Sequence, residues 1–306
     1  MTGKDSLKVE QQSLEVEYKK TGIKPSDIAA LRRWLKTQPH LPEKLITDLD
    51  LILVYFCCYE SSEVSKQVLD LHYTLKTLFT NLFHNRVVDE KMIKTLNIVL
   101  AVPLPIRSFD NHHVIYHKLI DCDSKNFIFS DVIRAVLMMM DLKQFEEGTW
   151  PGFIILIDLN GVTLGHIAKL DLLTVQQLLY YLQEAMLVRL KGLHFMNAPS
   201  YVDKLLMVIK PFMKKELMNT LCIHQVGSKT LEKVIPIEAL PKDAGGQYKT
   251  FEEAKNYVIE KALANKDFFE NENKKRVIES LRPGKPKTIT DIFGGVEGSF
   301  KKLEID

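Results

Sequence analysis

The sequence has no apolar run that could cross a membrane as a helix. A bilayer-spanning helix needs about 20 consecutive apolar residues, and the most apolar candidate, residues 45–59, contains Asp48 and Asp50. The first twelve residues, MTGKDSLKVEQQ, include no apolar stretch like that of a secretory signal. We therefore expect neither a transmembrane span nor a secretory leader.

Cysteine is scarce, and charge of one sign is not in excess. The cysteines are Cys57, Cys58, Cys122 and Cys222, and the first two are neighbours, which rarely pair with each other, so no disulfide framework is expected. This favours a reduced, cytoplasmic protein. Because 41 Lys and Arg oppose 39 Asp and Glu, the formal net charge is only +2, which gives no global support for nucleic-acid binding.

The usual motifs of catalysis are missing as well. GSKT at residues 227–230 has the wrong order for a phosphate-binding loop, GGVEG at 294–298 has no strand before it, and no G-x-S-x-G elbow is present. On a strand, His113 and His117 would share one face while His112 points away, which is poor geometry for one metal ion. We expect no enzyme activity, no metal and no cofactor.

What the sequence does contain is apolar residues at regular spacing. Their period predicts helices at residues 25–38, 43–59, 62–79 and 90–99, with proline or serine at three of the starts. The first 22 residues are polar and are expected to be flexible. The pattern then changes to predicted strands at 112–121, 152–159 and 191–197, alternating with helices at 130–147 and 171–190. This alternation predicts an α/β domain with a mostly parallel sheet.

Residues 199–224 carry the most informative pattern. One apolar stripe at helical spacing is formed by Val202, Leu205, Leu206, Ile209 and Met213, and lysines lie beside it at 210, 214 and 215. Taken alone, such a stripe is typical of a core helix, and a lysine run is typical of a solvated face. Together they suit a helical lid over a hydrophobic cavity that can also touch an anionic membrane.

The C-terminal part is simpler. Residues 239–247 contain Pro241, Gly245 and Gly246 and predict a turn, and residues 249–280 predict a polar helix. The remainder is rich in proline and glycine, with apolar anchors at Ile292, Phe293 and Phe300.

The order of these parts resembles the CRAL-TRIO (Sec14-like) lipid-transfer family. The motifs are IDLNG (157–161), GLHFMNAP (192–199), IKPF (209–212) and LPKDAGG (240–246), and the end of the chain resembles insect alpha-tocopherol transfer protein-like proteins. The resemblance implies a helical N-terminal domain at 23–100, a lipid-binding β/α domain at 101–248 with an apolar pocket, and a C-terminal helix and tail at 249–306. It also implies a mobile gate helix at 201–221.

The resemblance further implies which residues form the pocket. The expected wall consists of Ile133, Val136, Leu137, Met140, Ile155, Ile157, Leu178, Tyr181, Leu182, Val188, Leu190 and Leu193, with Val202, Leu206, Ile209 and Met213 from the gate. Serines of the tocopherol pocket correspond to Val136 and Met140 here, so this pocket is expected to be drier. His166 lies where the family often has a histidine, and we expect a structural hydrogen bond there rather than a catalytic base.

Related tocopherol carriers bind phosphoinositide headgroups through basic residues near the gate. Arg189 and Lys191 match that pattern, whereas Cys57, Glu216 and Thr220 depart from it. The expected membrane contacts are therefore Arg189 and Lys191, together with Lys210, Lys214 and Lys215.

The expected function is the binding and transfer of a hydrophobic small molecule between membranes, such as a tocopherol, retinoid or carotenoid. The resemblance implies a monomer that is peripheral to membranes and needs no cofactor besides its ligand. Two alternatives stay open: a lipid-gated adaptor that recruits a partner through the N-terminal helices or the tail, and a phosphatidylinositol/phosphatidylcholine exchanger.

Overall fold

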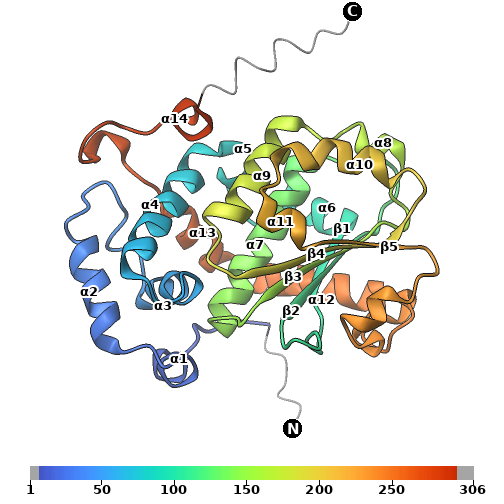
Figure 1. The fold of residues 1–306 in the computed structure, drawn as a ribbon, viewed down its shortest axis with the longest axis horizontal. Coiled ribbons are helices and arrows are strands. Elements are labelled where there is room, and N and C mark those ends of the chain that lie inside the picture. The colour runs from blue at the N-terminus through green and yellow to red at the C-terminus, as the bar shows by residue number, and fades with distance from the viewer. Residues whose placement is uncertain (1–6, 295–306) are drawn as a thin grey trace, which may run out of the picture.

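The computed structural model describes residues 7–294. Figure 1 shows a central sheet with helices on both of its faces and a block of N-terminal helices at one side. The predicted mixed α/β architecture is thereby confirmed. The predicted tail anchor Phe300 lies outside the described residues.

The helical block is formed by α1 (Leu14–Thr21), α2 (Pro25–Leu35), α3 (Asp48–Cys57), α4 (Ser62–Leu78) and α5 (Thr80–Phe83). The next helix, α6 (Glu90–Ile98), lies outside the block and packs beside β1, α7 and α12. The prediction that α3 starts at residue 43 was wrong. Thr47 caps this helix: its hydroxyl accepts from the Asp50 backbone N–H at 3.1 Å, and the Asp50 carboxylate accepts from the Thr47 N–H at 2.8 Å. This reciprocal cap fixes the first turn at Asp48.

The expected flexible N-terminus is wrong for residues 14–21, which form α1. Glu17 on α1 is fully buried, and its carboxylate accepts from the Thr149 backbone N–H at 3.0 Å and from the Thr149 hydroxyl at 2.7 Å. Lys20 pairs with the same carboxylate at 3.0 Å. Gly148 lets α1 approach this closely, because a Cβ there would lie 2.2 Å from the Glu17 Oε1 atom. Because residues 14–21 are polar, the sequence did not indicate that they form a helix packed against the rest of the protein.

The sheet has five strands in the order β1-β2-β3-β4-β5. They are β1 (Val99–Pro103), β2 (His113–Leu119), β3 (Phe153–Asp158), β4 (Leu190–Ala198) and β5 (Leu221–Gln225). β1 runs antiparallel to β2, and all other neighbours are parallel. The mostly parallel sheet is as predicted. The two short edge strands, β1 and β5, were not predicted.

The remaining helices are α7 (Phe129–Glu147), α8 (Leu164–Ile167), α9 (Leu172–Glu184), α10 (Val202–Ile209), α11 (Lys215–Asn219), α12 (Phe251–Ala264), α13 (Lys266–Lys274) and α14 (Ile289–Phe293). Short 3-10 turns occur at Lys210–Phe212, Thr230–Lys233, Ile237–Ala239, Lys242–Ala244 and Glu279–Leu281. The single predicted helix at 249–280 is thus two helices. They meet at Asn265, whose side-chain oxygen accepts from the Val9 N–H at 2.9 Å and whose amide donates to the Lys261 carbonyl.

The two faces of the sheet carry different apolar clusters. Alternation of side chains along each strand sends Tyr116 and Leu156 to one face, where Ala254 and Val258 of α12 complete the cluster. The opposite face presents strand residues at odd numbers: Ile115, Ile155, Leu193 and Phe195. Helices α7, α9 and α10 contribute to this second cluster, so that face of the sheet is the floor of any cavity beneath α10.

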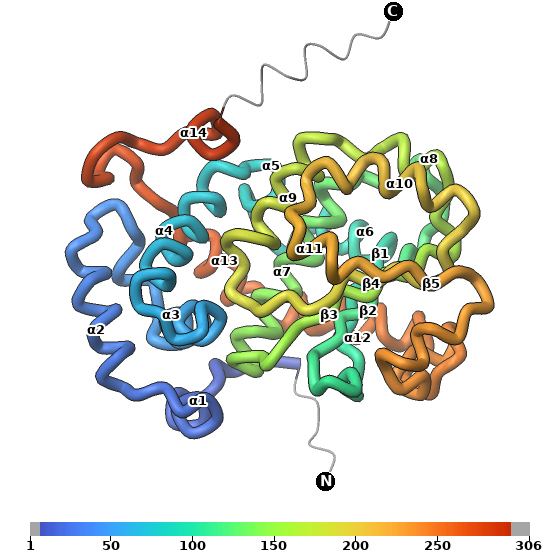
Figure 2. The backbone as a smooth tube through the Cα atoms, in the orientation of Figure 1, coloured from blue at the N-terminus to red at the C-terminus, as the bar shows by residue number. Residues whose placement is uncertain are grey.

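The chain after α13 returns along the N-terminal helices, as Figure 2 shows. Lys275 pairs with Asp50 of α3 at 2.8 Å, and Arg282 pairs with Asp70 of α4 at 2.7 Å. At the end of this segment Phe293 stacks on Phe79, with ring centroids 5.6 Å apart. The C-terminal segment therefore joins the helical block to the rest of the molecule, and Phe293 is an apolar anchor as predicted.

A buried charge cluster lies where α4 and α7 meet. The Asp141 carboxylate is 2.7 Å from Arg86 Nη1 and 3.2 Å from Lys76 Nζ, and the two cationic side chains are 2% and 3% exposed. Burial opposes ionisation of Asp141, but the charges of Lys76 and Arg86 outweigh it and hold the pKa of this carboxyl well below its ordinary value. The Asp141 carboxyl is therefore ionised near neutral pH.

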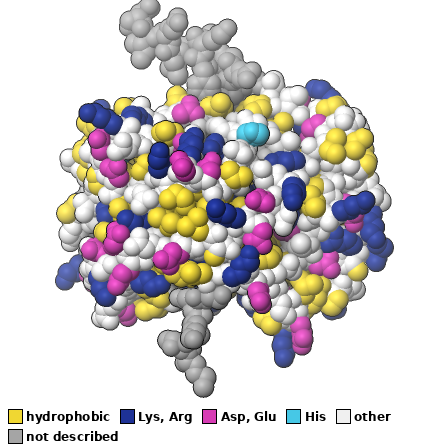
Figure 3. Space-filling view, turned by 180° about the vertical axis from the view of Figure 1, so that it is seen from behind, with side chains coloured by type: hydrophobic (Ala, Val, Ile, Leu, Met, Phe, Trp, Pro, Cys, Tyr) yellow, Lys and Arg dark blue, Asp and Glu magenta, His cyan; other side chains and the backbone are white. Residues whose placement is uncertain are grey.

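The surface agrees with the near-zero net charge. On the face shown in Figure 3, acidic and basic side chains are interspersed. Among residues 7–294, no helix has the length and hydropathy needed to span a bilayer.

Candidate functional site

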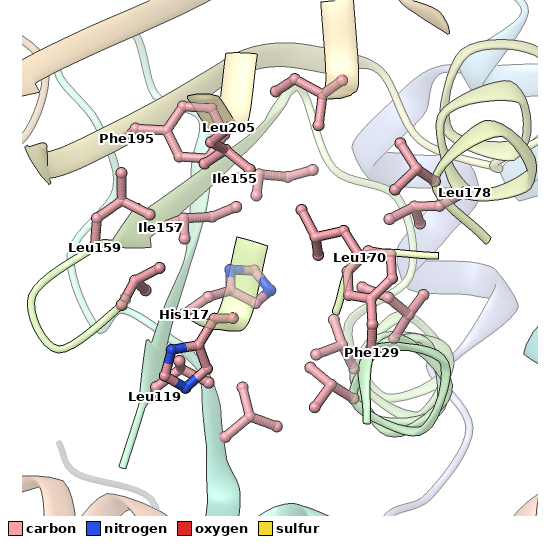
Figure 4. Close-up of a pocket in the computed structure, with 18 of the residues that line it drawn as sticks. His117, Leu119, Phe129, Ile155, Ile157, Leu159, Leu170, Leu178, Phe195 and Leu205 are labelled. Atoms are coloured by element: carbon pink, nitrogen blue, oxygen red, sulfur yellow. The ribbon is translucent and has the colours of Figure 1, made fainter. Parts of the chain in front are cut away.

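A cavity of about 230 Å³ lies between the sheet and helices α7, α9 and α10. One buried water occupies ~10–15 Å³ on the same scale, so the space suits a ligand rather than a single solvent molecule. Figure 4 shows Ile155, Ile157 and Phe195 on the sheet side, Phe129, Leu170 and Leu178 opposite them, and Leu205 at the top.

The described lining is almost entirely hydrocarbon. Its apolar members are Val99, Leu119, Phe127, Phe129, Val132, Ile133, Val136, Leu137, Met140, Ile155, Ile157, Leu159, Val162, Ile167, Leu170, Val175, Leu178, Leu179, Leu182, Leu193, Phe195, Leu205 and Ile209. Four polar side chains join them: His117, Lys118, Asp158 and His166. A surface of this kind excludes water and favours an apolar occupant.

Most of the predicted pocket residues lie on this wall. They are Ile133, Val136, Leu137, Met140, Ile155, Ile157, Leu178, Leu182, Leu193 and Ile209. The expected departure at Val136 and Met140 is visible, since both present apolar atoms to the cavity. That any of these residues contacts a ligand stays a prediction.

The other predicted residues lie elsewhere: Tyr181, Val188, Leu190, Val202, Leu206 and Met213. The cavity-facing side of α9 consists of Val175, Leu178, Leu179 and Leu182, at spacings of one helical face. Tyr181 lies off this stripe and packs edge-on against Phe83, with ring centroids 4.9 Å apart. Its position in the contact with the helical block explains its burial without a ligand.

The predicted gate is not one helix. α10 ends at Ile209, a 3-10 turn follows that contains Pro211, and α11 begins at Lys215. Proline has no N–H for the helical ladder, which explains the interruption. α10 directs Leu205 and Ile209 into the cavity. Leu206 is buried in the same apolar cluster but does not line the cavity, and Met207 is 71% exposed.

The predicted phosphoinositide residues occupy a contact with the helical block. The Arg189 guanidinium lies 3.9 Å from the centre of the Phe56 ring and 4.1 Å from that of Tyr59, and it donates to the Phe56 carbonyl. Lys191 donates to the Tyr59 hydroxyl at 3.2 Å. Both cations thus hold β4 against the end of α3.

The three lysines near the gate differ in their surroundings. Lys210, Lys214 and Lys215 are all exposed, and Lys214 pairs with Glu184 of α9 at 2.5 Å. They surround the interruption between α10 and α11, on the outer side of the segment that covers the cavity.

Two of the four polar side chains at the cavity already have partners. Asp158 accepts from the Tyr116 hydroxyl at 2.7 Å, from the Asn160 N–H at 2.9 Å and from the Asn197 amide at 2.9 Å. Lys118 donates to the Asn160 carbonyl at 2.7 Å. Asp158 therefore anchors the turn that follows β3.

The other two polar side chains at the cavity, His117 and His166, are less completely hydrogen-bonded than Asp158 and Lys118. His166 Nδ1 accepts from the Thr163 N–H at 3.0 Å, which is the structural hydrogen bond expected for this residue. The outer nitrogen of His166, Nε2, and His117 Nδ1 are buried without a hydrogen-bond partner among the described residues. Sequence reasoning did not place either histidine in the pocket. The signal for His117 was its odd-numbered position on β2, in phase with the cavity-facing residues of β3.

The described residues 7–294 contain no cluster of three His, Cys, Asp or Glu side chains that could hold a metal ion. His113 instead stacks on Trp150, with ring centroids 4.9 Å apart.

The buried histidines predict how stability depends on pH. Burial lowers the pKa of His72 to about 3 and that of His117 to about 4, whereas both titrate near 6.5 when unfolded. Below that value the unfolded chain binds more protons than the folded one, so stability falls as the pH drops through 6.5 towards 4. Asp70, whose pKa is lowered to about 2 by its cationic partners against the effect of burial, contributes a loss only below about 4.

We therefore expect unfolding titrations in denaturant to show a loss on the order of 2 kcal/mol per buried histidine between pH 7 and pH 4.5. His72→Asn keeps a donor for the Ala185 carbonyl, which His72 Nδ1 contacts at 2.8 Å, and removes the titration, so its pH slope should be shallower. His84→Gln, at an exposed position, is the matched control and should leave the slope unchanged. An equal slope for wild type and His72→Asn would contradict this assignment.

Comparison with known proteins gives two family matches. Residues 102–246 match the CRAL/TRIO domain, and residues 22–93 match the Pinta-like UBA domain. The first range contains β2 to β5 and most of the cavity wall. The second contains α2 to α5 and the start of α6.

Related proteins cover different shares of the chain. Clavesin-1 of Xenopus laevis is 25% identical over 224 residues, which span 72% of this chain and 67% of the relative. Alpha-tocopherol transfer protein-like of Mus musculus is 30% identical over 122 residues, or 40% of this chain and 36% of the relative. The crystal structure of Sfh5 aligns with a TM-score of 0.43 at 12% identity, covering 94% of this chain and 97% of that structure.

The CRAL/TRIO match and the related sequences confirm the family resemblance, while the suggested insect origin stays a prediction. The CRAL/TRIO match includes the IDLNG, GLHFMNAP, IKPF and LPKDAGG motifs, and the cavity lies within the same segment. The chain therefore contains a CRAL/TRIO domain at residues 102–246, with a Pinta-like UBA domain in front of it at residues 22–93.

Proposed function

We propose that the protein binds a hydrophobic small molecule in the cavity and transfers it between membranes, without catalysis. The observation that carries this proposal is the apolar lining of a 230 Å³ cavity inside the CRAL/TRIO domain. The family consists of lipid-binding transfer proteins, which agrees with such a role. We further propose that the protein acts as a cytoplasmic monomer that associates peripherally with membranes.

The magnitudes are compatible with reversible carriage. A ligand of roughly 20 to 30 non-hydrogen atoms gains ~0.3 kcal/mol per atom, or about 6–9 kcal/mol in total, which corresponds to dissociation constants from tens of micromolar to sub-micromolar. Such a ligand stays bound in water and can still leave when the cavity opens against a bilayer.

The gate in this proposal is the segment from α10 to α11. Moving Leu205 and Ile209 from the cavity into water would cost about 1.5–3 kcal/mol for each side chain. Against a bilayer these side chains, with the exposed Met207, enter the interface instead, and most of the cost disappears. Membrane contact is therefore proposed to favour the open form.

We assign the contact with anionic lipid to Lys210, Lys214 and Lys215 on the gate. Each exposed cation near an anionic surface contributes about 1 kcal/mol. Arg189 and Lys191 are assigned a smaller share, because they are already held by Phe56 and Tyr59. The ion pair with Glu184 reduces the share of Lys214 in the same way.

A vesicle assay tests the proposal. Donor vesicles of phosphatidylcholine carry a fluorescent apolar probe and a quencher, and acceptor vesicles carry neither. We expect the protein to raise the transfer rate above the spontaneous rate, and to raise it further when acceptors contain about 20% phosphatidylserine, as the charge argument requires. A rate equal to the spontaneous one for sterol, retinoid, tocopherol and phospholipid probes alike would contradict the proposal. Transfer confined to phosphatidylinositol and phosphatidylcholine would identify an exchanger instead.

A further inference from the structure

We infer that Gln183 of α9 is a positioning residue that holds the gate closed, by hydrogen-bonding the backbone on both sides of the interruption between α10 and α11. The inference rests on the proposed function and deepens it, because it names a residue that sets how often the gate opens. Gln183 was not among the residues predicted from the sequence.

The interruption of the gate lies beside α9. This helix packs against α10 and against the 3-10 turn Lys210–Phe212, and Figure 1 shows α9 next to α10. Met213 and Lys214 then separate the turn from α11, and both have an extended backbone, with ψ of 128° and 162°. Carbonyl groups at the end of one helical segment and N–H groups at the start of the next need partners from outside those segments. The gate therefore presents backbone polar groups to α9 at this point.

The side chain of Gln183 spans the interruption. Its Nε2 atom donates to the Phe212 carbonyl at 3.1 Å, and its Oε1 atom accepts from the Lys214 N–H at 2.6 Å. Nε2 also donates to the Leu179 carbonyl, one turn back on α9, at 2.8 Å. Both amide hydrogens are thus used. The bond to Leu179 fixes the amide on its own helix, so the two outer bonds hold the gate in one position relative to α9.

The contact requires an amide. A carboxylate at position 183 would accept from the Lys214 N–H, but it would face two carbonyl oxygens without a proton to donate. Because the partners in the gate are backbone atoms, the contact does not depend on the side chains of Phe212 and Lys214. It depends on the conformation of the interruption, and it is made only while the gate lies against α9.

The adjoining ion pair contributes less. Glu184 pairs with the Lys214 side chain at 2.5 Å, but that side chain is 55% exposed. Water and salt weaken such a pair, whereas Gln183 is half-buried and its bond to the Phe212 carbonyl is partly buried. Leu205 holds α10 through apolar contact in the cavity. Gln183 supplies the directional contact at the middle of the gate.

This arrangement predicts an effect on rates rather than on affinity. Gln183 is not among the described residues that line the cavity, so its bonds stabilise the closed form equally with and without a ligand. Such a contact leaves the affinity unchanged while both forms stay predominantly closed. It lowers the population of the open form, however, and therefore slows both the entry and the release of a ligand.

The test replaces Gln183 with methionine. Gln183→Met keeps the length of the side chain and the helix propensity, but it can pair with neither backbone group of the gate. Gln176→Met is the matched control. Gln176 lies two turns earlier on α9, and its side chain has no hydrogen bond among the described residues. Both variants thus carry the same chemical change on one helix.

Thiol labelling measures opening of the gate without any ligand. Ile209→Cys is introduced into wild type and both variants, because position 209 is buried in the cavity wall. A charged maleimide reacts there when the gate opens, and peptide mass spectrometry gives the rate. We expect Gln183→Met to raise this rate about tenfold, as the loss of two partly exposed hydrogen bonds implies, and Gln176→Met to leave it unchanged. The native Cys58, buried next to the end of α3, is the internal reference for unfolding.

Two labelling results would overturn the inference. The first is an equal rate at position 209 in wild type and in Gln183→Met. The second is a rise at Cys58 of the same size as that at position 209, which would show general destabilisation instead of an effect on the gate.

Release of a bound probe connects the contact with transfer. The probe is 1-decylpyrene, and its release into an excess of pure phosphatidylcholine vesicles is followed by fluorescence. We expect Gln183→Met to release it about tenfold faster, with the equilibrium partition between protein and vesicles within about twofold of wild type, and Gln176→Met to match wild type in both. A changed partition with an unchanged release rate would show that Gln183 shapes the cavity rather than holds the gate, and would overturn the inference.

The outcomes separate the inference from the proposed function. If wild type binds and transfers an apolar probe but neither labelling nor release responds to Gln183→Met, only the inference fails. If neither 1-decylpyrene nor the sterol, retinoid, tocopherol and phospholipid probes enter the wild-type protein, the proposed function fails. The inference then fails with it, because the segment that Gln183 holds is no gate.

Discussion

Replacing Leu205 and Ile209 together with aspartate is expected to reduce the affinity for an apolar ligand by at least about 100-fold. Both side chains line the cavity from α10. Two ionised carboxylates there would lie against hydrocarbon without a cation, which costs far more than the ~2.7 kcal/mol that a 100-fold loss represents. The helix would have to leave the cavity, or the carboxyls would have to stay protonated.

The measurement is equilibrium partition of a fluorescent apolar probe, with circular dichroism to confirm that the helices remain. Met207→Asp is the matched control: it lies on the same helix, but its side chain is 71% exposed and faces away from the cavity. It should leave equilibrium binding within about twofold and slow transfer between vesicles, because it hinders insertion into the interface. Unchanged affinity in the double variant would show that α10 does not enclose the binding site.

Replacing Asp141 with alanine is expected to lower the free energy of unfolding by about 3–5 kcal/mol. The change removes the shared partner of Arg86 and Lys76, which contact Asp141 at 2.7 and 3.2 Å and are almost completely buried. Lys76 would still have a carboxylate partner, Glu272, at 3.6 Å. Arg86 would therefore lose more of its charge compensation than Lys76. An uncompensated buried charge is one of the few causes of so large a loss.

Urea unfolding at pH 7 measures this effect. Glu63→Ala is the control, because it breaks an ion pair with Lys66 in which the carboxylate is 78% exposed; it should cost less than about 1 kcal/mol. If Asp141→Ala were no more destabilising than this control, the buried cluster would have to be solvated or already neutral.

The sequence was sufficient for the elements with strong and unambiguous patterns. The apolar run FIILID is typical of a strand covered on both faces, and it forms β3. The long apolar face of α7 was equally clear, and four predicted wall residues, Ile133, Val136, Leu137 and Met140, come from it. Where the apolar period of an element and its boundaries are both visible in its own residues, the sequence predicts that element correctly.

The wrong predictions arose where contacts between distant parts of the chain determine which side chains are buried. Leu205 and not Leu206 faces the cavity, a difference of one position that turns a side chain by about 100° around a helix. The apolar stripe of α10 is too wide to show which edge points inward. Glu17 is a second case: a polar residue on a polar segment is buried because Thr149, far along the chain, bonds its carboxylate.

The positions of His117 and His166 at the cavity were beyond sequence reasoning for another reason. His117 looked like a strand residue in a histidine-rich segment, and His166 like a local structural residue. Each interpretation holds as far as its own neighbours are concerned. That both leave one nitrogen unpaired at one cavity depends on the packing of β1, β2 and α8, which no single segment encodes.

The segment over the cavity is tethered at both ends to adjacent strands. Only residues 199–201 separate the end of β4 from α10, and only Thr220 separates α11 from β5. β4 and β5 are hydrogen-bonded neighbours, so the two attachment points cannot move apart, and linkers of three residues and one residue extend by ~3.5 Å per residue at most. The two attachment points lie at opposite ends of these parallel strands, because Leu221 pairs with Leu193 and Ala198 pairs with Gln225. Any excursion of α10 and α11 is thus an arc about an axis that runs along the strands, and the asymmetric linkers give α10 the longer reach.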